Sequence, residues 1–167
     1  MAATIRLRPA TAADLAAILA IEHAVFTDPW APASFESEFD DPYGWFHVAV
    51  DDDDGGAVVG YAMARFVAGE GEVMNIAVVP ARRGHGLGGT LLDAALAAAS
   101  AANCDAMWLE VRVSNTAARR LYDSRGFELV GRRRGYYRRP VEDALVLRRP
   151  LRAGADHGAA GAAVASP

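Results

Sequence analysis

Hydrophobic and polar positions in the first forty residues follow two different periods. Residues 4–8 (TIRLR) alternate between polar and apolar side chains, which predicts a β-strand. Over residues 11–26 a Thr-x-x-Asp pattern typical of a capping box precedes apolar residues spaced three or four apart, which predicts a helix. A second, short helix is expected from Pro32, since proline is favoured in the first turn of a helix.

Longer apolar stretches follow in the middle of the chain. Residues 45–50 and 57–67 are predicted to be two strands joined by the turn DDDDGG, and residues 71–79 a third strand of the same antiparallel meander. An alanine-rich helix is predicted over residues 88–102, and residues 106–113 (AMWLEVRV) form the next strand. Because this is the one clear strand-helix-strand crossover, the sheet is expected to be mixed and mostly antiparallel.

The last third of the chain has one more helix signal and two more strands. Asn115 is a favoured N-cap residue ahead of a helix that Gly126 ends at the expected position. Residues 127–137 and 143–149 are predicted to be strands. Residues 153–167 have neither periodicity nor bulky apolar side chains and are expected to be disordered.

The element order predicts the fold class. It is β-α-α-β-β-β-α-β-α-β-β, which is an α/β arrangement with a mixed central sheet flanked by about four helices. The chain has 167 residues, of which 52% are hydrophobic, and this is enough for one substantial core. We therefore expect a single domain over residues 1–152, followed by the tail at residues 153–167.

Composition excludes several classes of protein. Cys104 is the only cysteine, so an intramolecular disulfide is impossible, and the four histidines lack the spacing of a zinc site. Neither a secretory signal nor an apolar run of membrane-spanning length is present. These features predict a cytoplasmic protein with no bound metal and no membrane partner, and they leave the oligomeric state open.

Charge is distributed unevenly along the chain. Residues 1–110 contain sixteen acids and five arginines, whereas residues 111–167 contain five acids and twelve arginines. Such asymmetry can mark a nucleic-acid surface, but the segment RRRGYYRR interleaves its arginines with only one tyrosine pair. A solvated surface is the favoured interpretation, and no direct nucleic-acid partner is expected.

Residues 84–89 (GHGLGG) contain a G-x-G-x-x-G string between a predicted strand and a predicted helix, as in dinucleotide-binding folds. Two features argue against a dinucleotide. The four residues PARR separate the strand from the first glycine, and about eighty residues precede the loop. A Walker loop is excluded because the chain contains no lysine. The amides of Gly86 to Thr90 at a helix N-terminus, with Arg82 and Arg83, still favour a pyrophosphate ligand.

Two motifs carry a family resemblance. Arg83, Gly86 and Gly88 fit the pattern Q/R-x-x-G-x-G/A, and residues 115–127 (NTAARRLYDSRGF) fit N-x-x-A-x-x-x-Y-x-x-x-G-F. Together with the element order, they make residues 4–150 resemble the GNAT superfamily of N-acetyltransferases. The segments FTDPW, GEVMNIAV, LEVRVSN and RRGYYRRPVEDALVL look like its RimI branch, the ribosomal-protein N-terminal alanine acetyltransferases.

The resemblance implies an acetyl-CoA-dependent enzyme that acetylates the α-amino group of a ribosomal protein's N-terminal alanine. By resemblance, Glu110 is the base that removes the amine proton and Tyr122 the acid that protonates the departing thiolate. Asn115 is a further coenzyme contact, and a backbone N–H near Val78 is expected to stabilise the oxyanion. The acetyl and pantetheine groups would contact the strand backbone of Ile76, Ala77 and Val78. The pyrophosphate would be held by Arg83, Gly84, His85, Gly86, Leu87, Gly88 and Gly89.

The acceptor side of the site is expected near three aromatic residues, Trp30, Tyr136 and Tyr137. Neighbouring strand residues point to opposite faces, so at most one of the two tyrosines should meet the substrate. Basic residues of a substrate peptide are expected to be attracted by four acids, Asp40, Asp41, Glu142 and Asp143.

Each of these residues also has a plain structural interpretation. Glu110 could be a strand carboxylate paired with Arg112 or Arg65, Tyr122 a core aromatic, and Asn115 an N-cap alone. Two other functions stay open as well. The chain could acetylate a small amine or a lysine side chain, or it could be a non-catalytic acetyl-CoA sensor.

Overall fold

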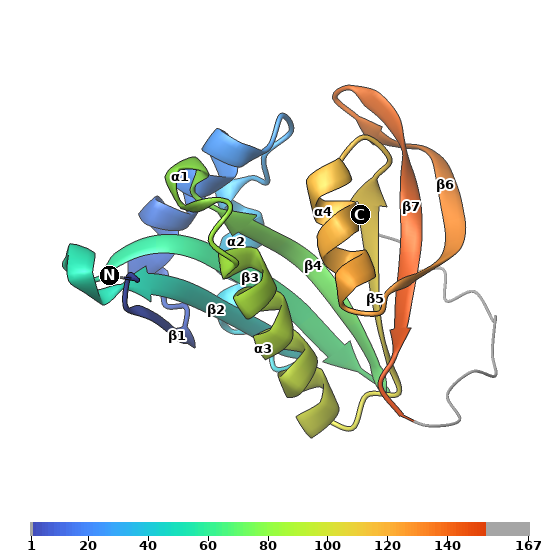
Figure 1. The fold of residues 1–167 in the computed structure, drawn as a ribbon, viewed down its shortest axis with the longest axis horizontal. Helices are drawn as coiled ribbons and strands as arrows, with labels where there is room; N and C mark the ends of the chain where they lie inside the picture. Colours follow the sequence, from blue (N-terminus) through green and yellow to red (C-terminus); the bar gives the residue numbers. More distant parts are fainter. Residues whose placement is uncertain (1, 153–167) are drawn as a thin grey trace.

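A seven-stranded sheet forms the centre of the molecule, and helices cover both of its faces (Figure 1). The computed structural model describes residues 2–152. The strands are β1 (Ile5–Pro9), β2 (Gly44–Asp51), β3 (Ala57–Val67), β4 (Glu70–Val78), β5 (Ala106–Arg112), β6 (Glu128–Arg138) and β7 (Val141–Pro150). The helices are α1 (Leu15–Val25), α2 (Pro32–Phe39), α3 (Leu87–Ala101) and α4 (Thr116–Ser124). The α/β fold and the element order predicted from the sequence are confirmed.

Local signals in the sequence account for the helix ends. The Thr11 backbone N–H donates to Asp14 Oδ2 at 2.8 Å ahead of α1, as the capping pattern predicts. Asn115 Oδ1 accepts from the Ala118 N–H at 3.2 Å and caps α4. Gly126 follows α4 with a φ of 80°, a left-handed conformation that glycine adopts without strain.

The sheet consists of two antiparallel parts that meet at one short parallel seam. Its strand order is β1-β2-β3-β4-β5-β7-β6. The parallel pairing of β4 with β5 covers three residue pairs, Glu70 with Ala106, Gly71 with Met107 and Glu72 with Trp108. Beyond these pairs the two strands diverge, and the sheet opens into a fork (Figure 1).

Apolar side chains fill both faces of the sheet. On the face covered by α1 and α2, Ile18 and Phe35 pack against Val48 and Tyr61, and all four are fully buried. On the opposite face, residues of α3 and α4 pack against β5 in a cluster that includes fully buried Leu92. Burying a side chain of this size contributes about 1.5–3 kcal/mol. Both strands that form the fork are therefore anchored in the core.

The predicted tail at residues 153–167 lies outside the described residues, so the domain boundary at residue 152 stays a prediction.

Candidate active site

The fork between β4 and β5 contains four of the residues expected to act, Ile76, Ala77, Val78 and Glu110. Ile76, Ala77 and Val78 pair with β3 on one side, while β5 does not pair with this stretch on the other. The backbone of β4 is therefore open to a ligand along the fork. On β5, Glu110 lies two residues beyond the last parallel pair.

The turn after β4 ends at an exposed helix N-terminus. Gly84 and Gly86 have φ values of 78° and 77°, and Gly86 is the N-cap of α3. A Cβ placed on Gly86 would meet no atom within 4 Å, so the space above it is open. The amides of Leu87, Gly88 and Gly89 start the helix and donate to no acceptor among residues 2–152. These three amides suit an anion such as a phosphate.

Two expectations about this turn need correction. The Thr90 N–H donates to the Gly86 carbonyl at 3.0 Å, the first i to i−4 hydrogen bond of α3. This N–H is therefore not available to a ligand. The guanidinium of Arg82 is bonded to Asp51, which is 1% exposed. Arg83, in contrast, is exposed and has no ion pair within the described part of the chain. Arg83 is thus the cation that the turn can offer to a phosphate.

A hollow of about 710 Å³ lies between this turn, the N-terminal residues and the β2–β3 turn. Asp51, Asp53 and Asp54 contribute to its lining. Leu87 at the start of α3 also lines it, so Asp53 and Asp54 disfavour a phosphate at one side of the hollow and the helix amides favour one at the other.

Glu110 is held by an arginine that the sequence did not indicate. Its Oε1 accepts from Arg133 Nη1 of β6 at 2.6 Å, and its side chain is 22% exposed. The alternative pairing with Arg112 or Arg65 is wrong. Arg112 lies 3.5 Å from Glu142, and Arg65 bonds to Asp41 at 2.6 Å. Arg133 thus fixes the carboxylate of Glu110 while leaving part of it accessible.

Glu72 is a second carboxylate at the fork, and sequence reasoning missed it. It is half-buried on β4 and pairs laterally with Trp108, which shares a face of β5 with Glu110. Burial, and then the negative charge of Glu110, raise the pKa of Glu72, while Arg65 and Arg133 oppose the shift. Its signal in the sequence was the same as that of Glu110, an acid within an apolar strand.

Tyr122 enters the site from α4. Its ring packs edge-on against Phe127 at 5.7 Å, and the side chain is 8% exposed. Burial raises its pKa to about 12, so the phenol stays protonated at neutral pH. The hydroxyl makes no hydrogen bond to the residues that the structure describes. Tyr122 is therefore both a core aromatic and an uncommitted proton donor.

Asn115 and Tyr122 are seven residues apart, a spacing that puts them on the same face of a helix. They nevertheless differ in exposure, because Tyr122 is buried. Asn115 is exposed and its Oδ1 caps α4. The N-cap interpretation is therefore confirmed, and a coenzyme contact through the remaining amide group stays a prediction.

The two neighbouring tyrosines of β6 do not follow strand alternation. Gly135 has a φ of 58°, and the pairing with β7 is irregular between Arg133 and Tyr137. As a result the rings of Tyr136 and Tyr137 pack edge to face, with 5.1 Å between their centroids. The prediction that they point to opposite faces is wrong, because a β-bulge redirects side chains. Burial, followed by the charge of Glu110, raises the pKa of Tyr137.

Trp30 lies in the segment between α1 and α2 and is partly buried. Its ring is 5.6 Å from that of Phe35, a core residue, and its backbone N–H donates to Glu22 Oε1 at 3.0 Å. Glu22 is 1% exposed and also accepts from the hydroxyl of Tyr61 and from Asn75 Nδ2. This buried network, which the sequence did not reveal, ties the Trp30 segment to β4.

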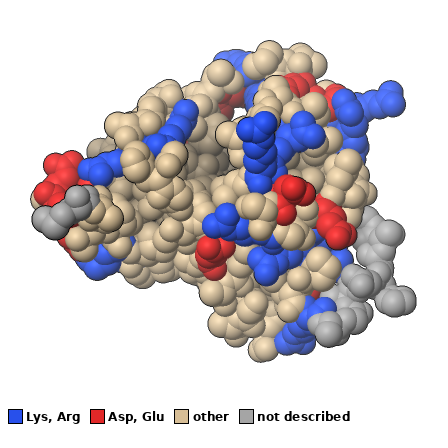
Figure 2. All heavy atoms as spheres, in the orientation of Figure 1, with Lys and Arg blue, Asp and Glu red and all other residues tan. Residues whose placement is uncertain are grey.

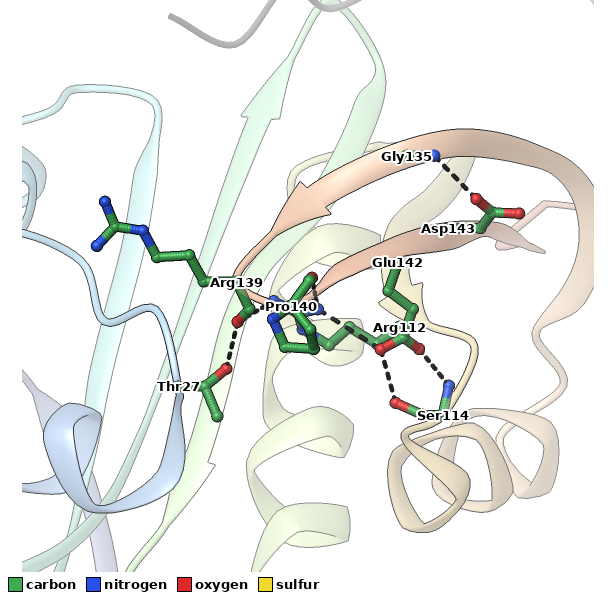
Figure 3. Close-up of polar contacts among 8 residues, drawn as sticks. All are labelled: Thr27, Arg112, Ser114, Gly135, Arg139, Pro140, Glu142 and Asp143. Atoms are coloured by element: carbon green, nitrogen blue, oxygen red, sulfur yellow. Dashed lines mark hydrogen bonds and ion pairs between the residues drawn. The ribbon is translucent and has the colours of Figure 1, made fainter.

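A turn between β6 and β7 faces the same segment (Figure 3). Thr27 Oγ1 donates to the Arg139 carbonyl at 2.7 Å. Arg112 approaches from β5 and donates to the carbonyls of Pro140 at 3.0 Å and Arg139 at 3.3 Å. The contacts therefore join the α1–α2 segment, the end of β5 and the β6–β7 turn.

Most of the acids expected to attract a basic peptide are already bonded within the chain. Asp41 binds Arg65, Glu142 accepts from Ser114, and Asp143 accepts from Arg132 at 2.7 Å. Figure 2 shows arginines gathered over the half of the molecule that contains α4, β6 and β7, with acids among them. The expectation that these acids steer a basic peptide is weakened, because their charge is balanced locally.

No group of three or more histidine, cysteine or acidic residues within residues 2–152 could hold a metal ion. Over the same residues, no helix is long and apolar enough to cross a membrane.

Comparison with known proteins indicates a family. The profile of the acetyltransferase (GNAT) family matches residues 15–127. The chain is 40% identical to the N-alpha-acetyltransferase RimI of Mycobacterium tuberculosis over 145 residues, which cover 83% of this chain and 88% of that protein.

Solved structures agree with this match. The crystal structure of the ribosomal-protein-S18-alanine N-acetyltransferase from Escherichia coli superposes with a TM-score of 0.82 and 30% identity, over 93% of this chain and 99% of that one. A NatC complex bound to Gag peptide and CoA gives a TM-score of 0.81 at 25% identity, over 89% and 99% of the two chains.

Proposed function

Because this chain belongs to the GNAT family of acetyltransferases, we propose that it transfers the acetyl group of acetyl-CoA to the α-amino group of a protein N-terminus. The expected acceptor is the N-terminal alanine of a ribosomal protein, as the name of the similar Escherichia coli enzyme states for that protein. The observation that carries the proposal is the fork, where the open strand edge of Ile76 to Val78 lies on β4 and the carboxylate of Glu110 on β5.

The donor side is proposed to hold acetyl-CoA. Pyrophosphate is proposed to lie on the amides of Leu87 to Gly89, with Arg83 adding charge. The pantetheine arm would follow the open backbone of Ile76 to Val78, and Asn115 would contact it from the start of α4.

Chemistry at the acceptor requires a neutral amine. An α-amino group has a pKa of about 8, so about one-tenth of it is neutral at pH 7, whereas far less of a lysine side chain is neutral. Glu110 is proposed to accept the ammonium proton, either directly or through a water molecule. Arg133 holds Glu110 in position for this transfer.

Attack of the amine on the thioester creates an oxyanion and then releases a thiolate. A backbone N–H near Val78 is proposed to stabilise the oxyanion. When the carbon–sulfur bond breaks, Tyr122 is proposed to give its hydroxyl proton to the thiolate, a role that its protonated state permits, and the proton that the attacking nitrogen then loses restores the phenol.

The test compares two peptides that differ in their available amine. One begins with a free alanine, and the other has a blocked N-terminus and contains lysine. We expect kcat/KM with acetyl-CoA to be much higher for the free peptide, measured by mass spectrometry of the acetylated product. A preference for the blocked peptide or for a small polyamine would leave only the broader acetyltransferase assignment. Binding of acetyl-CoA without turnover of any amine would favour a sensor.

A further inference from the structure

Arg112 makes contacts in four directions at the end of β5. Its Nη1 donates to the Pro140 carbonyl at 3.0 Å, and its Nη2 donates to the Arg139 carbonyl at 3.3 Å. Its guanidinium carbon lies 4.1 Å from the ring centroid of Tyr137, and Nη1 is 3.5 Å from Glu142 Oε1. A planar guanidinium can make all of these contacts at once, which an ammonium cannot.

Glu142 balances the charge of Arg112 and is itself fixed. Its carboxylate accepts from the Ser114 N–H at 2.6 Å and from Ser114 Oγ at 2.8 Å (Figure 3). Arg112 therefore lies near Glu110 as part of a neutral pair. An approaching ammonium group meets little repulsion from it.

The Arg139 carbonyl connects Arg112 to the other side of the site. It accepts from Thr27 Oγ1 at 2.7 Å as well as from Arg112. Thr27 belongs to the segment that contains Trp30, whereas Arg112 lies two residues beyond Glu110 on the same face of β5. One carbonyl oxygen thus joins the Thr27 segment to the end of β5.

We infer that Arg112 is a positioning residue for the acceptor: it holds the Arg139–Pro140 turn against Thr27 and the ring of Tyr137 beside Glu110. It does not touch the reacting atoms. The inference rests on the proposed function, because it names the residue that shapes the opening for the acceptor amine. Its effect should therefore fall on acceptor binding and leave donor binding unchanged.

The test replaces Arg112 with glutamine and measures both Michaelis constants. We expect Arg112→Gln to raise the KM of the free-alanine peptide about 10-fold or more, and to change the KM of acetyl-CoA less than about 2-fold. Hydrogen exchange should become faster in residues 136–141 and stay unchanged in α3. Equal rises in both constants, or exchange that accelerates throughout the protein, would mean a general structural role and would overturn the inference.

Three further variants separate geometry from charge. Arg6→Gln is the matched control, because Arg6 also pairs with an acid, Asp52 at 2.9 Å, but lies on β1 and contacts neither carbonyl of the turn. It should leave the acceptor KM unchanged. Arg112→Lys keeps the charge and should still raise that KM, whereas full rescue by lysine would contradict the positioning role. Thr27→Val removes the second donor to Arg139 and should act in the same direction as Arg112→Gln.

The hydrogen-exchange measurement needs no substrate. If the unmodified protein fails to acetylate either peptide, the proposed function fails, and the exchange pattern of Arg112→Gln still shows whether Arg112 holds the turn. If the unmodified protein is active and Arg112→Gln leaves the acceptor KM unchanged, the inference about Arg112 alone is wrong.

Discussion

Glu110 lies on β5 and Tyr122 on α4, and the two side chains have different surroundings. Glu110 is partly exposed and bonded to Arg133, whereas Tyr122 is buried and its hydroxyl has no partner among the described residues. A carboxylate that water can reach suits proton removal, and a buried phenol suits proton donation. Their separate environments make the two roles separable by substitution.

We expect Glu110→Gln and Tyr122→Phe each to lower kcat by about 10²-fold or more. Affinity for acetyl-CoA should change little, because neither side chain belongs to the turn that is proposed to hold the pyrophosphate. Steady-state kinetics together with calorimetric binding of acetyl-CoA would measure both effects. Glu70→Gln is the control, because it also removes a strand carboxylate but one with no role in the proposed chemistry. Glu70 lies at the start of β4 and accepts from Trp108 Nε1 at 2.7 Å. Near-normal turnover in either variant would disprove that residue's role.

Among the elements, the start of α3 depends on the absence of a side chain at Gly86. Its φ of 77° is unfavourable for a β-branched residue, and a side chain there would project into open space beside the free amides. We expect Gly86→Val to abolish binding of acetyl-CoA in a calorimetric titration. Ala97→Val, which puts the same side chain at an exposed position near the other end of α3, should bind nearly normally. Unchanged affinity in Gly86→Val would place the pyrophosphate elsewhere.

The β6–β7 hairpin carries two carboxylates whose hydrogen bonds depend on pH. The Ser114 amide and hydroxyl lower the pKa of Glu142, and the Gly135 amide and Arg132 lower that of Asp143. A lowered pKa in the folded state means that these bonds stabilise the hairpin above the usual carboxyl pKa of about 4 and are lost as pH falls below it.

We therefore expect hydrogen exchange in residues 134–143 to accelerate between about pH 5 and pH 3, relative to its intrinsic rate, before α3 is affected. The double variant Glu142→Gln and Asp143→Asn should show little of this pH dependence. A hairpin that opens equally in both proteins would assign the change to other groups.

Sequence periodicity was sufficient to predict the helices and strands, but it could not predict contacts between segments that are distant in the sequence. Asn115, Gly126 and the capping pattern placed the helix ends because these signals are local. The bond between Thr27 and Arg139 joins residues 112 positions apart, and no local pattern indicates such a contact. Arg133 as the partner of Glu110 was missed for the same reason. Gly135 was a visible signal for the bulge, since glycine inside a strand often marks one.

The partners of buried polar residues also could not be predicted from the sequence. Glu22 lies on the apolar face of α1, where its carboxylate is fully bonded to Tyr61, Asn75 and Trp30. A sequence shows that such an acid interrupts an apolar face, but the donors that satisfy it come from three other segments. Contiguous motifs were enough to name candidate site residues, whereas the partners of Glu110 and Glu22 depend on the packing of the sheet and could not be named.

For the whole molecule, binding of acetyl-CoA should raise the free energy of unfolding and therefore the melting temperature. A ligand that binds only the folded state at 100 times its Kd adds about 2.7 kcal/mol, which for a protein of this size raises Tm by about 5–10 °C. We expect this shift with acetyl-CoA in a thermal melt and none with NAD at the same concentration. Equal shifts from both ligands would restore the dinucleotide interpretation of residues 84–89.

The parallel seam of three residue pairs has a consequence for how the two substrates influence each other. It is the narrowest join in the sheet, so the part formed by β1 to β4 and the part formed by β5 to β7 can move relative to each other most easily along this line. A donor lying in the fork would touch both parts and lower the entropy of that motion. An acceptor that binds afterwards would lose less entropy, so the two substrates should bind cooperatively even without a change in average structure. By thermodynamic reciprocity, the peptide should tighten binding of a non-reactive acetyl-CoA analogue by the same factor, which calorimetry in both orders of addition would measure.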